Sequence, residues 1–221
     1  MPTPARPPRP PLVEEDALVP LALGALAHDQ RVDAAALAGC ELAGARASGV
    51  VLSACSLHDV DLAGAALEAL TLANVVIERG SLANVQARRA RIGPARICGV
   101  RMTGIVLAGA RLADVAFRGC LLDLASFADA TLERVSFEEC RLAQADFLDA
   151  RLDSVRLDGC DLTQADLRGA RLRHCELRGC TLDSLQGVER LRGAAMPWAD
   201  IVAWAGLWAG ALGIADLDGD T

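Results

Sequence analysis

The stretch from Ala145 to Leu172 reads ADFLDARLDSVRLDGCDLTQADLRGARL and carries a large apolar residue at every fifth position. The same spacing holds without a slip from Leu37 to Leu182, where 28 of the 30 positions in the series are Leu, Ile, Met or Phe. A second series lies two residues before each of these positions and consists mainly of Ala, Val and Cys. The chain is therefore organised by one uninterrupted repeat of five residues.

A period of five fits neither of the regular secondary structures. A helix needs apolar residues three to four positions apart, and a strand needs them two apart. Two inward residues separated by one outward residue predict a short extended segment, and Gly two residues after the large one, as at Gly159 and Gly169, predicts a turn. Repeating this unit coils the chain, and each unit buries its apolar face only by stacking on its neighbours.

Individual units resemble the motif of the pentapeptide-repeat family, which is small–Asp/Asn–Leu/Phe–polar–Gly. The closest matches are Ala165-Asp166-Leu167-Arg168-Gly169 and Val60-Asp61-Leu62-Ala63-Gly64. The resemblance covers about two thirds of the chain. It implies an all-β fold for residues 31–185, a right-handed quadrilateral β-solenoid of about 7–8 coils with four pentapeptides in each coil. We expect short helical caps at both ends.

A coil of four pentapeptides stacks residues that are 20 positions apart. All four Phe of the sequence then fall on two opposite columns in consecutive coils, with Phe117 and Phe137 on one and Phe127 and Phe147 on the other. At a strand spacing of ~4.8 Å the stacked coils make a rod of roughly 36 Å.

The N-terminal residues 1–12 read MPTPARPPRPPL and hold six prolines with little to bury. We interpret them as a disordered Pro-rich tail, with a partner-docking motif as the alternative. Residues 13–30 place Glu14, Glu15 and Asp16 before an apolar run, which predicts a helical segment that caps the first coil. Basic residues before this run and the sequence Ala25-Leu26-Ala27 are also compatible with a signal peptide, but the acids favour the cap and a cytoplasmic protein.

The C-terminal residues 186–215 lose the period of five. Pro197 and Gly213 bracket a predicted helix on which Ile201, Trp204, Trp208 and Leu212 share one face. We expect this face to cover the last coil around Leu177 and Leu182 and to join two chains as a homodimer. The helix is too short to span a membrane, and residues 216–221 form an acidic tail.

The residues that commonly carry chemistry point away from catalysis. Seven of the eight cysteines lie in the small inward series, so we interpret them as core residues. The histidines do not share a side with inward cysteines, and the sequence shows neither a phosphate-binding loop nor a nucleophile elbow. A convex rod offers no concave pocket. We therefore expect no enzyme, no cofactor and no metal site.

Charge is distributed unevenly along the rod. Residues 79–118 carry eight Arg and one Asp, a net of +7, whereas residues 123–166 carry eleven acids and four Arg, a net of −7. Four acids flank the Phe127 and Phe147 column, and we expect them to form an acidic interaction face without basic neighbours. They are Asp129, Asp146, Asp149 and Asp166.

The family resemblance also bears on function. The best-studied members are quinolone-resistance proteins that bind DNA gyrase or topoisomerase IV as acidic mimics of duplex DNA, often as dimers through C-terminal helices. Residues 31–185, however, hold 20 acids and 18 Arg, whereas B-DNA of the same length carries about 21 charges. The C-terminal segment from Leu191 to Asp200 also resembles a bacterial branch with no assigned activity. We favour a protein-interaction scaffold whose protein partner is unknown and which does not itself bind nucleic acid. The alternative is a DNA mimic that binds gyrase.

Overall fold

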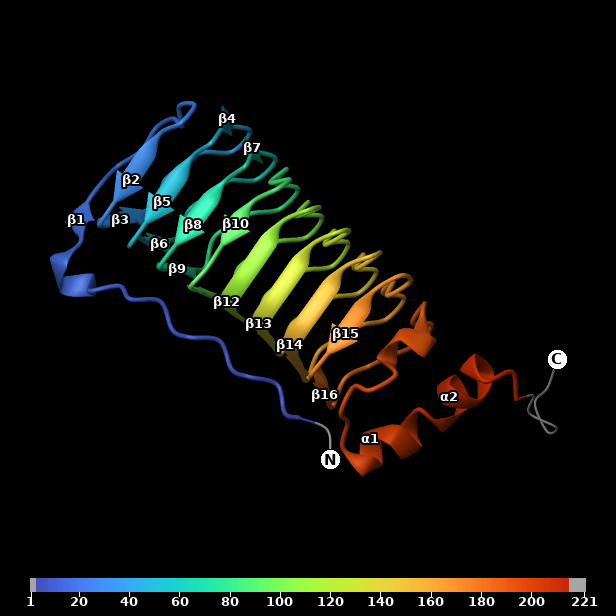
Figure 1. Ribbon diagram of the computed structural model, residues 1–221. Helices are drawn as coiled ribbons and strands as arrows, with labels where there is room; N and C mark the ends of the chain where they lie inside the picture. The colour runs from blue at the N-terminus through green and yellow to red at the C-terminus, as the bar shows by residue number, and fades with distance from the viewer. Residues whose placement is uncertain (1–2, 215–221) are drawn as a thin grey trace.

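The chain winds into a parallel β-solenoid in the computed structural model, which describes residues 3–214 (Figure 1). Each coil takes 20 residues, because the strand partners on one side follow one another as Arg31, Val51, Thr71, Arg91, Arg111, Thr131, Arg151 and Arg171. These eight positions correspond to eight coils. The β-solenoid implied by the family resemblance is confirmed.

The rod has four faces, which we name A to D in chain order. Face A holds the first segment of each coil and face B the second, and strands β12 to β14 run around the corner between them. Face D contains the short pair β4 and β7, and beyond that pair faces C and D are linked by single bridges between coils. The strands are β1 (Val19–Pro20), β2 (Arg31–Asp33), β3 (Ala35–Ala38), β4 (Arg46–Ser48), β5 (Val51–Ser53), β6 (Ser56–His58), β7 (Ala66–Glu68), β8 (Thr71–Ala73), β9 (Val75–Glu78), β10 (Arg91–Ile92), β11 (Ala95–Cys98), β12 (Arg111–Arg118), β13 (Thr131–Glu138), β14 (Arg151–Asp158), β15 (Arg171–Arg173) and β16 (Glu176–Arg178).

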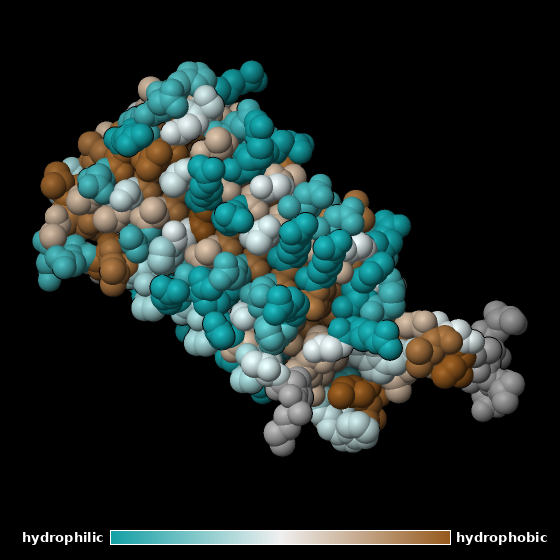
Figure 2. All heavy atoms as spheres, in the orientation of Figure 1, coloured by the Kyte–Doolittle hydropathy of each residue, from teal (hydrophilic) through white to brown (hydrophobic). Residues whose placement is uncertain are grey.

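On the face seen in Figure 2 polar side chains predominate along the rod, and apolar side chains gather at its two ends. Val19 and Leu21 are exposed at the N-terminal end, and Trp198 and Leu212 at the C-terminal end. A stack of coils buries its inner walls but leaves the outermost coils without a neighbour, so apolar side chains remain exposed at both ends, in addition to Leu121, Leu124 and Leu148 on the sides. Among the described residues, no helix has the length and apolar character needed to cross a membrane.

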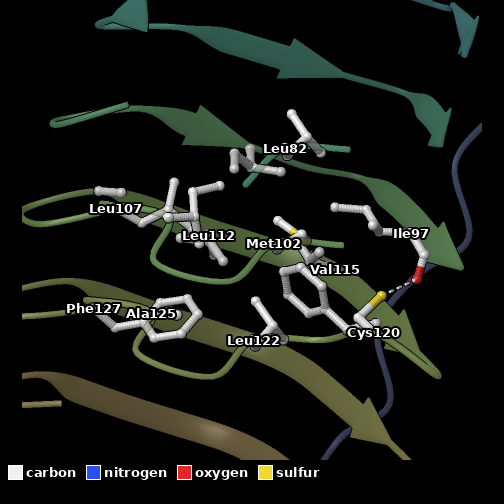
Figure 3. Close-up of a cluster of buried hydrophobic side chains, with 14 of the residues drawn as sticks. Leu82, Ile97, Met102, Leu107, Leu112, Val115, Cys120, Leu122, Ala125 and Phe127 are labelled. Carbon is white, nitrogen blue, oxygen red and sulfur yellow. Dashed lines mark hydrogen bonds between the residues drawn. The ribbon is translucent and has the colours of Figure 1, made fainter. Parts of the chain in front are cut away.

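The interior is a continuous stack of apolar columns (Figure 3). Phe117 and Phe137 stack with their ring centroids 4.9 Å apart, and Phe127 and Phe147 stack at 5.0 Å on the opposite wall. Phe127 also meets the edge of Phe137 across the core, at 6.0 Å. Both predicted aromatic columns are therefore present, and an edge contact joins them.

Seven of the eight free cysteines are buried and Cys98 is half-buried. The Cys120 thiol donates to the carbonyl oxygen of Ile97 at 3.4 Å, and the Cys175 thiol donates to the carbonyl of Arg173 at 3.3 Å. Burial raises the pKa of Cys175 to about 11. These contacts are those of small core residues, as the sequence predicts.

The N-terminal cap differs from the predicted helix. Residues 13–30 contain only a short 3-10 helix, η1 (Glu15–Ala17), followed by β1. Strand β1 pairs in parallel with β3 on face B, and the Leu21 N–H donates to the carbonyl of Ala36 at 2.9 Å. The open edge of the first coil presents unpaired backbone groups, and a strand satisfies them where a helix does not. Leu23 and Leu26 then pack against the core.

The Pro-rich segment also differs from the expected disordered tail. Residues 3–12 lie extended along the rod from its last coil towards its first (Figure 1). The Ala5 N–H donates to a carboxylate oxygen of Glu176 at 2.9 Å, and Ala5 is buried. The segment has few apolar side chains to bury, but its backbone N–H groups donate to polar side chains of the rod, and these bonds hold it in place.

Candidate interaction surfaces

The last coil is closed by residues that follow the repeats. Ala195 bonds on both sides of Glu176, donating to the carbonyl of Cys175 at 2.9 Å and accepting from the N–H of Leu177 at 3.0 Å. The 3-10 helix η2 (Val188–Leu191) places Leu191 in the core. The cap around Leu177 is thus built largely by this connecting segment, before the predicted helix begins.

The predicted C-terminal helix is broken into two short ones, α1 (Trp198–Ala203) and α2 (Ala205–Ala211). The break is at Trp204, with φ −103° and ψ 23°. The Trp204 indole donates to the carbonyl of Cys180 at 3.1 Å, and the Asp200 carboxylate accepts the N–H of Gly179 at 2.7 Å. These two bonds fix α1 to the end of the rod. Contrary to the prediction, Trp204 therefore points towards the rod and does not share a face with Ile201, Trp208 and Leu212.

The remaining predicted residues line an apolar groove between α2 and η2. Ile201, Trp208 and Leu212 border this groove of about 510 Å³ together with Leu191 and Met196. The Trp208 indole donates to the carbonyl of Ile201 at 2.9 Å, which keeps its ring along the groove. Leu212 is 76% exposed. Short helices with exposed apolar side chains at the end of a polar rod form a candidate protein interface.

The four predicted acids all lie on face D, in two rows. Asp146 and Asp166 are bridge partners in adjacent coils, and Asp129 and Asp149 occupy the following corner with positive φ. The Asp146 carboxylate accepts the N–H of Leu148 at 2.9 Å, and the Asp166 carboxylate accepts the N–H of Arg168 at 2.9 Å. Asp146 and Asp166 therefore stabilise the turns that follow them, while Asp129 and Asp149 are exposed.

The expectation that these acids lack basic neighbours is wrong for Asp166. Arg168 donates to the Asp166 carboxylate from Nη2 at 2.6 Å and from Nε at 3.0 Å. This hydrogen-bonded guanidinium lowers the pKa of Asp166. The pair forms because residues on either side of an inward position both point outward, so Arg168 reaches back over Leu167.

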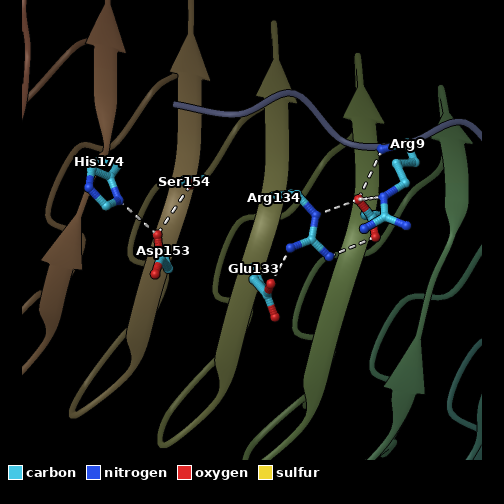
Figure 4. Close-up of polar contacts among 7 residues, drawn as sticks. Arg9, Glu133, Arg134, Asp153, Ser154 and His174 are labelled. Atoms are coloured by element: carbon cyan, nitrogen blue, oxygen red, sulfur yellow. Dashed lines mark hydrogen bonds and ion pairs between the residues drawn. The ribbon is translucent and has the colours of Figure 1, made fainter. Parts of the chain in front are cut away.

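A polar network that the sequence did not suggest lies at the corner between faces A and B (Figure 4). Arg134 binds the Asp114 carboxylate through two nitrogens, at 2.7 and 2.8 Å, and lowers its pKa. In the next coils, Asp153 accepts from Ser154 at 3.2 Å and lies 3.1 Å from the ring of His174. Asp114, Arg134, Ser154 and His174 occupy equivalent corner positions with positive φ. The available signal was that this one corner carries a polar residue in each of the last four coils, at Asp114, Arg134, Ser154 and His174.

The sequence matches the family description "Pentapeptide repeat region" over residues 70–147 and 110–186, and "Pentapeptide repeats (8 copies)" over residues 33–68. These matches extend over more than half of the chain. The chain belongs to the pentapeptide-repeat family. No curated protein sequence matches it.

Two trypsin-treated variants of QnrB1, a plasmid-mediated fluoroquinolone resistance protein, have folds similar to this pentapeptide-repeat chain. The first is 21% identical with a TM-score of 0.54, over 89% of this chain and 98% of QnrB1. The second is 20% identical with a TM-score of 0.51, over 90% and 99%. HetL, a pentapeptide-repeat protein involved in heterocyst differentiation regulation from the cyanobacterium Nostoc, is 22% identical over 77% of this chain and 91% of HetL, with a TM-score of 0.38. The first two similarities show a shared fold.

Proposed function

We propose that this pentapeptide-repeat chain is a non-enzymatic protein-interaction scaffold that forms a homodimer through its C-terminal end. The observation that carries the proposal is the apolar groove between α2 and η2, with Trp198 76% exposed and Val202 55% exposed on the adjacent helix. A bacterial cytoplasmic location fits the free cysteines, because that compartment keeps thiols reduced.

A second copy of the chain suits this groove. Residues 201–214 contain no charged side chain, and Glu189 and Arg192 are the only charged residues among the described ones that line the groove, so association through it desolvates few ions. A two-fold interface brings the same patch of each subunit together, which lets the groove of one copy receive the exposed Leu212 of the other. The rods would then point away from the joint in opposite directions, with their long faces open to partners.

Light scattering of the full chain tests the dimer. Leu212→Glu places a charge in the groove without touching the rod, and we expect it to convert a dimer into a monomer. Leu124→Glu is the matched control, because Leu124 is 56% exposed on the side of the rod. A wild-type monomer at high concentration, or dimers of equal stability in both variants, would contradict the proposal.

The acidic rows of face D support a second candidate, a DNA mimic that binds DNA gyrase or a related topoisomerase. Carboxylates at Asp129 and Asp149, and at Asp146 and Asp166, recur once per coil, or about every 4.8 Å of rod. DNA carries one charge per ~1.7 Å of its axis. The net negative charge per length of rod approaches that of DNA only in the segment 123–166, which carries eleven acids and four Arg. This segment lies towards the C-terminal end, so a C-terminal dimer would bring two such segments together.

Gyrase supercoiling in the presence of the protein tests this second candidate. Asn at positions 146 and 166 keeps the oxygen that caps the turn, and Asn at positions 129 and 149 replaces exposed carboxylates, so the rod should stay folded while four charges are removed. Asn at Asp61 and Asp161, which cap turns on face C, is the control. We expect inhibition by the wild type and by the control, and loss of inhibition in the face D variant. Absence of inhibition by micromolar wild type would rule out the mimic and leave the dimeric scaffold.

A further inference from the structure

The N-terminal segment Thr3–Leu12, TPARPPRPPL, lies across the corner between faces A and B; we call it the strap (Figures 1 and 4). Three of its backbone N–H groups donate to side-chain oxygens of the rod. Ala5 donates to Glu176 at 2.9 Å, Arg9 to Asp114 at 3.0 Å, and Leu12 to Asn74 at 3.2 Å. These acceptors lie in the eighth, fifth and third coils, so the strap spans most of the rod.

The spacing of donors and acceptors matches a polyproline II helix. This conformation rises about 3.1 Å per residue, and coils stack at about 4.8 Å. The three residues from Arg9 to Leu12 therefore rise ~9.3 Å, against ~9.6 Å for the two coils between Asp114 and Asn74. The four residues from Ala5 to Arg9 rise ~12 Å, against ~14 Å for three coils, and the longer Glu176 side chain spans the difference.

The composition of the strap fits the same role. Proline at positions 4, 7, 8, 10 and 11 fixes φ and removes the N–H, so the strap is already extended before it docks. Only five of its residues retain an N–H, and three of these are the donors to the rod. A pre-extended segment loses little conformational entropy on binding, which is how Pro-rich ligands bind in other grooves.

The acceptors are held in place by the rod itself. Arg178 and Arg156 contact the buried Glu176 carboxylate at 3.0 and 3.4 Å, and Arg134 grips Asp114 through two nitrogens. Five of the six buried polar residues of the described chain lie on face B or at this corner; the sixth, Ser81, lies on face C. The five are Ser56, Asp114, Ser136, Ser154 and Glu176. Outward-facing residues of a solenoid are normally exposed, so the burial of these five polar residues indicates that another segment covers this side of the rod.

We propose that Asn74, Asp114 and Glu176 form a recognition surface for extended Pro-rich protein segments, in which the side-chain oxygens of these three residues accept N–H groups at positions i, i+4 and i+7 of the segment. The occupant is the strap of the same chain, docked in cis. Because the strap is tethered, its effective concentration is on the order of millimolar. A separate segment with the same pattern displaces it at such concentrations, and a segment without the pattern does not.

The chain contains no lysine, so an amine-reactive dansyl dye labels only the N-terminal amino group. All three tryptophans lie between residues 198 and 208, at the end of the rod where Ala5 binds. Energy transfer from tryptophan to dansyl therefore reports the docked strap. A released strap stays attached near the first coil, about seven coil spacings or ~34 Å away, and transfer falls.

Proline at positions 5 and 9 together removes two donors and preserves the extended conformation. Each lost bond to a carboxylate weakens docking about tenfold, so we expect an overall loss of about 100-fold and a fall in transfer. Arg9→Ala keeps the N–H and removes a 3.7 Å ion pair between the Arg9 guanidinium, which is 74% exposed, and Asp114; a pair with so exposed a guanidinium contributes little, so transfer should stay close to that of the wild type. Arg6→Pro changes a residue whose N–H bonds to no described residue and should keep full transfer. Circular dichroism checks the rod, whose core contains no residue before Leu23.

Added TPARPPRPPL peptide at millimolar concentration should lower transfer in the labelled full chain, and the same peptide with Pro at the third and seventh positions should not. Unchanged transfer in the double proline variant would overturn the proposal. Equal competition by both peptides would also overturn it, because the three acceptors would then not distinguish segments by their N–H pattern.

Discussion

Replacing Phe137 with Leu should destabilise the rod more than the same replacement of Phe147. Both residues lie in the sixth coil on opposite walls, and both are buried. Phe137 stacks on Phe117 at 4.9 Å and meets the edge of Phe127 at 6.0 Å, whereas Phe147 has one aromatic neighbour, at 5.0 Å. An aromatic pair contributes about 0.5–1.5 kcal/mol beyond burial. The variant at 137 therefore loses ~1–3 kcal/mol of ring contacts and the variant at 147 ~0.5–1.5 kcal/mol.

The loss of side-chain volume is common to both variants, so the difference between them isolates the second ring contact. Leu suits either wall, since Leu157 and Leu167 follow in the same two columns. Thermal melts should show the 137 variant unfolding about 1–6 °C below the 147 variant, at ~2–4 °C per kcal/mol for a chain of this length. A double-mutant cycle with Phe117→Leu measures the stacked pair directly. Equal melting temperatures, or the opposite order, would mean that packing volume alone sets the stability of these columns.

Three further changes test the turns, the thiols and the corner network. Gly93→Ala should cost more than the ~1–2 kcal/mol expected for a left-handed non-glycine residue, because a Cβ there overlaps the carbonyl of Ala113; Gly99→Ala, with open space around it, is the control in a denaturant melt. Thiol titration of the native protein should find one reactive group, the half-buried Cys98, and eight after unfolding, since the other thiols are buried and burial raises the pKa of Cys175 to about 11. Asp114→Asn should lower stability by about 1.5–3 kcal/mol between pH 5 and 8. Arg134 lowers the pKa of Asp114 below its ordinary 3.8, so its contribution is present above that value and the gap between wild type and variant should close as the pH falls further; a gap that stayed constant down to pH 2 would contradict this.

The repeat was predictable because one physical demand recurs in every unit. Each pentapeptide must bury one large and one small side chain, so the period of five appears in the sequence and fixes the coils, the columns and the aromatic stacks. With four units in each coil, Phe117, Phe127, Phe137 and Phe147 could be assigned to two walls by counting in twenties. A resemblance to the pentapeptide-repeat family supplied the number of sides, which periodicity does not determine.

The parts that sequence reasoning missed depend on single contacts with no period. The strap is held by backbone N–H donors at Ala5 and Arg9. Its composition, by contrast, shows only a Pro-rich segment with few apolar side chains to bury, which predicts disorder. The helix break follows one indole bond, from Trp204 to Cys180. Asp166 pairs with Arg168 because alternate residues point the same way, which could have been inferred from the strand period of two.

The placement of these parts restricts where a partner can bind. The strap occupies the corner between faces A and B, and the N-terminal end is edged by β1, which pairs with β3. The exposed acids Asp129 and Asp149 lie on face D, away from the strap, and the apolar groove lies at the C-terminal end. A partner that binds acids and a second copy that binds the groove would therefore use separate surfaces, and neither would need to displace the strap. Loss of the strap should consequently leave dimerisation and any acid-dependent binding unchanged. A Pro-rich segment, by contrast, should gain access only when the strap is released.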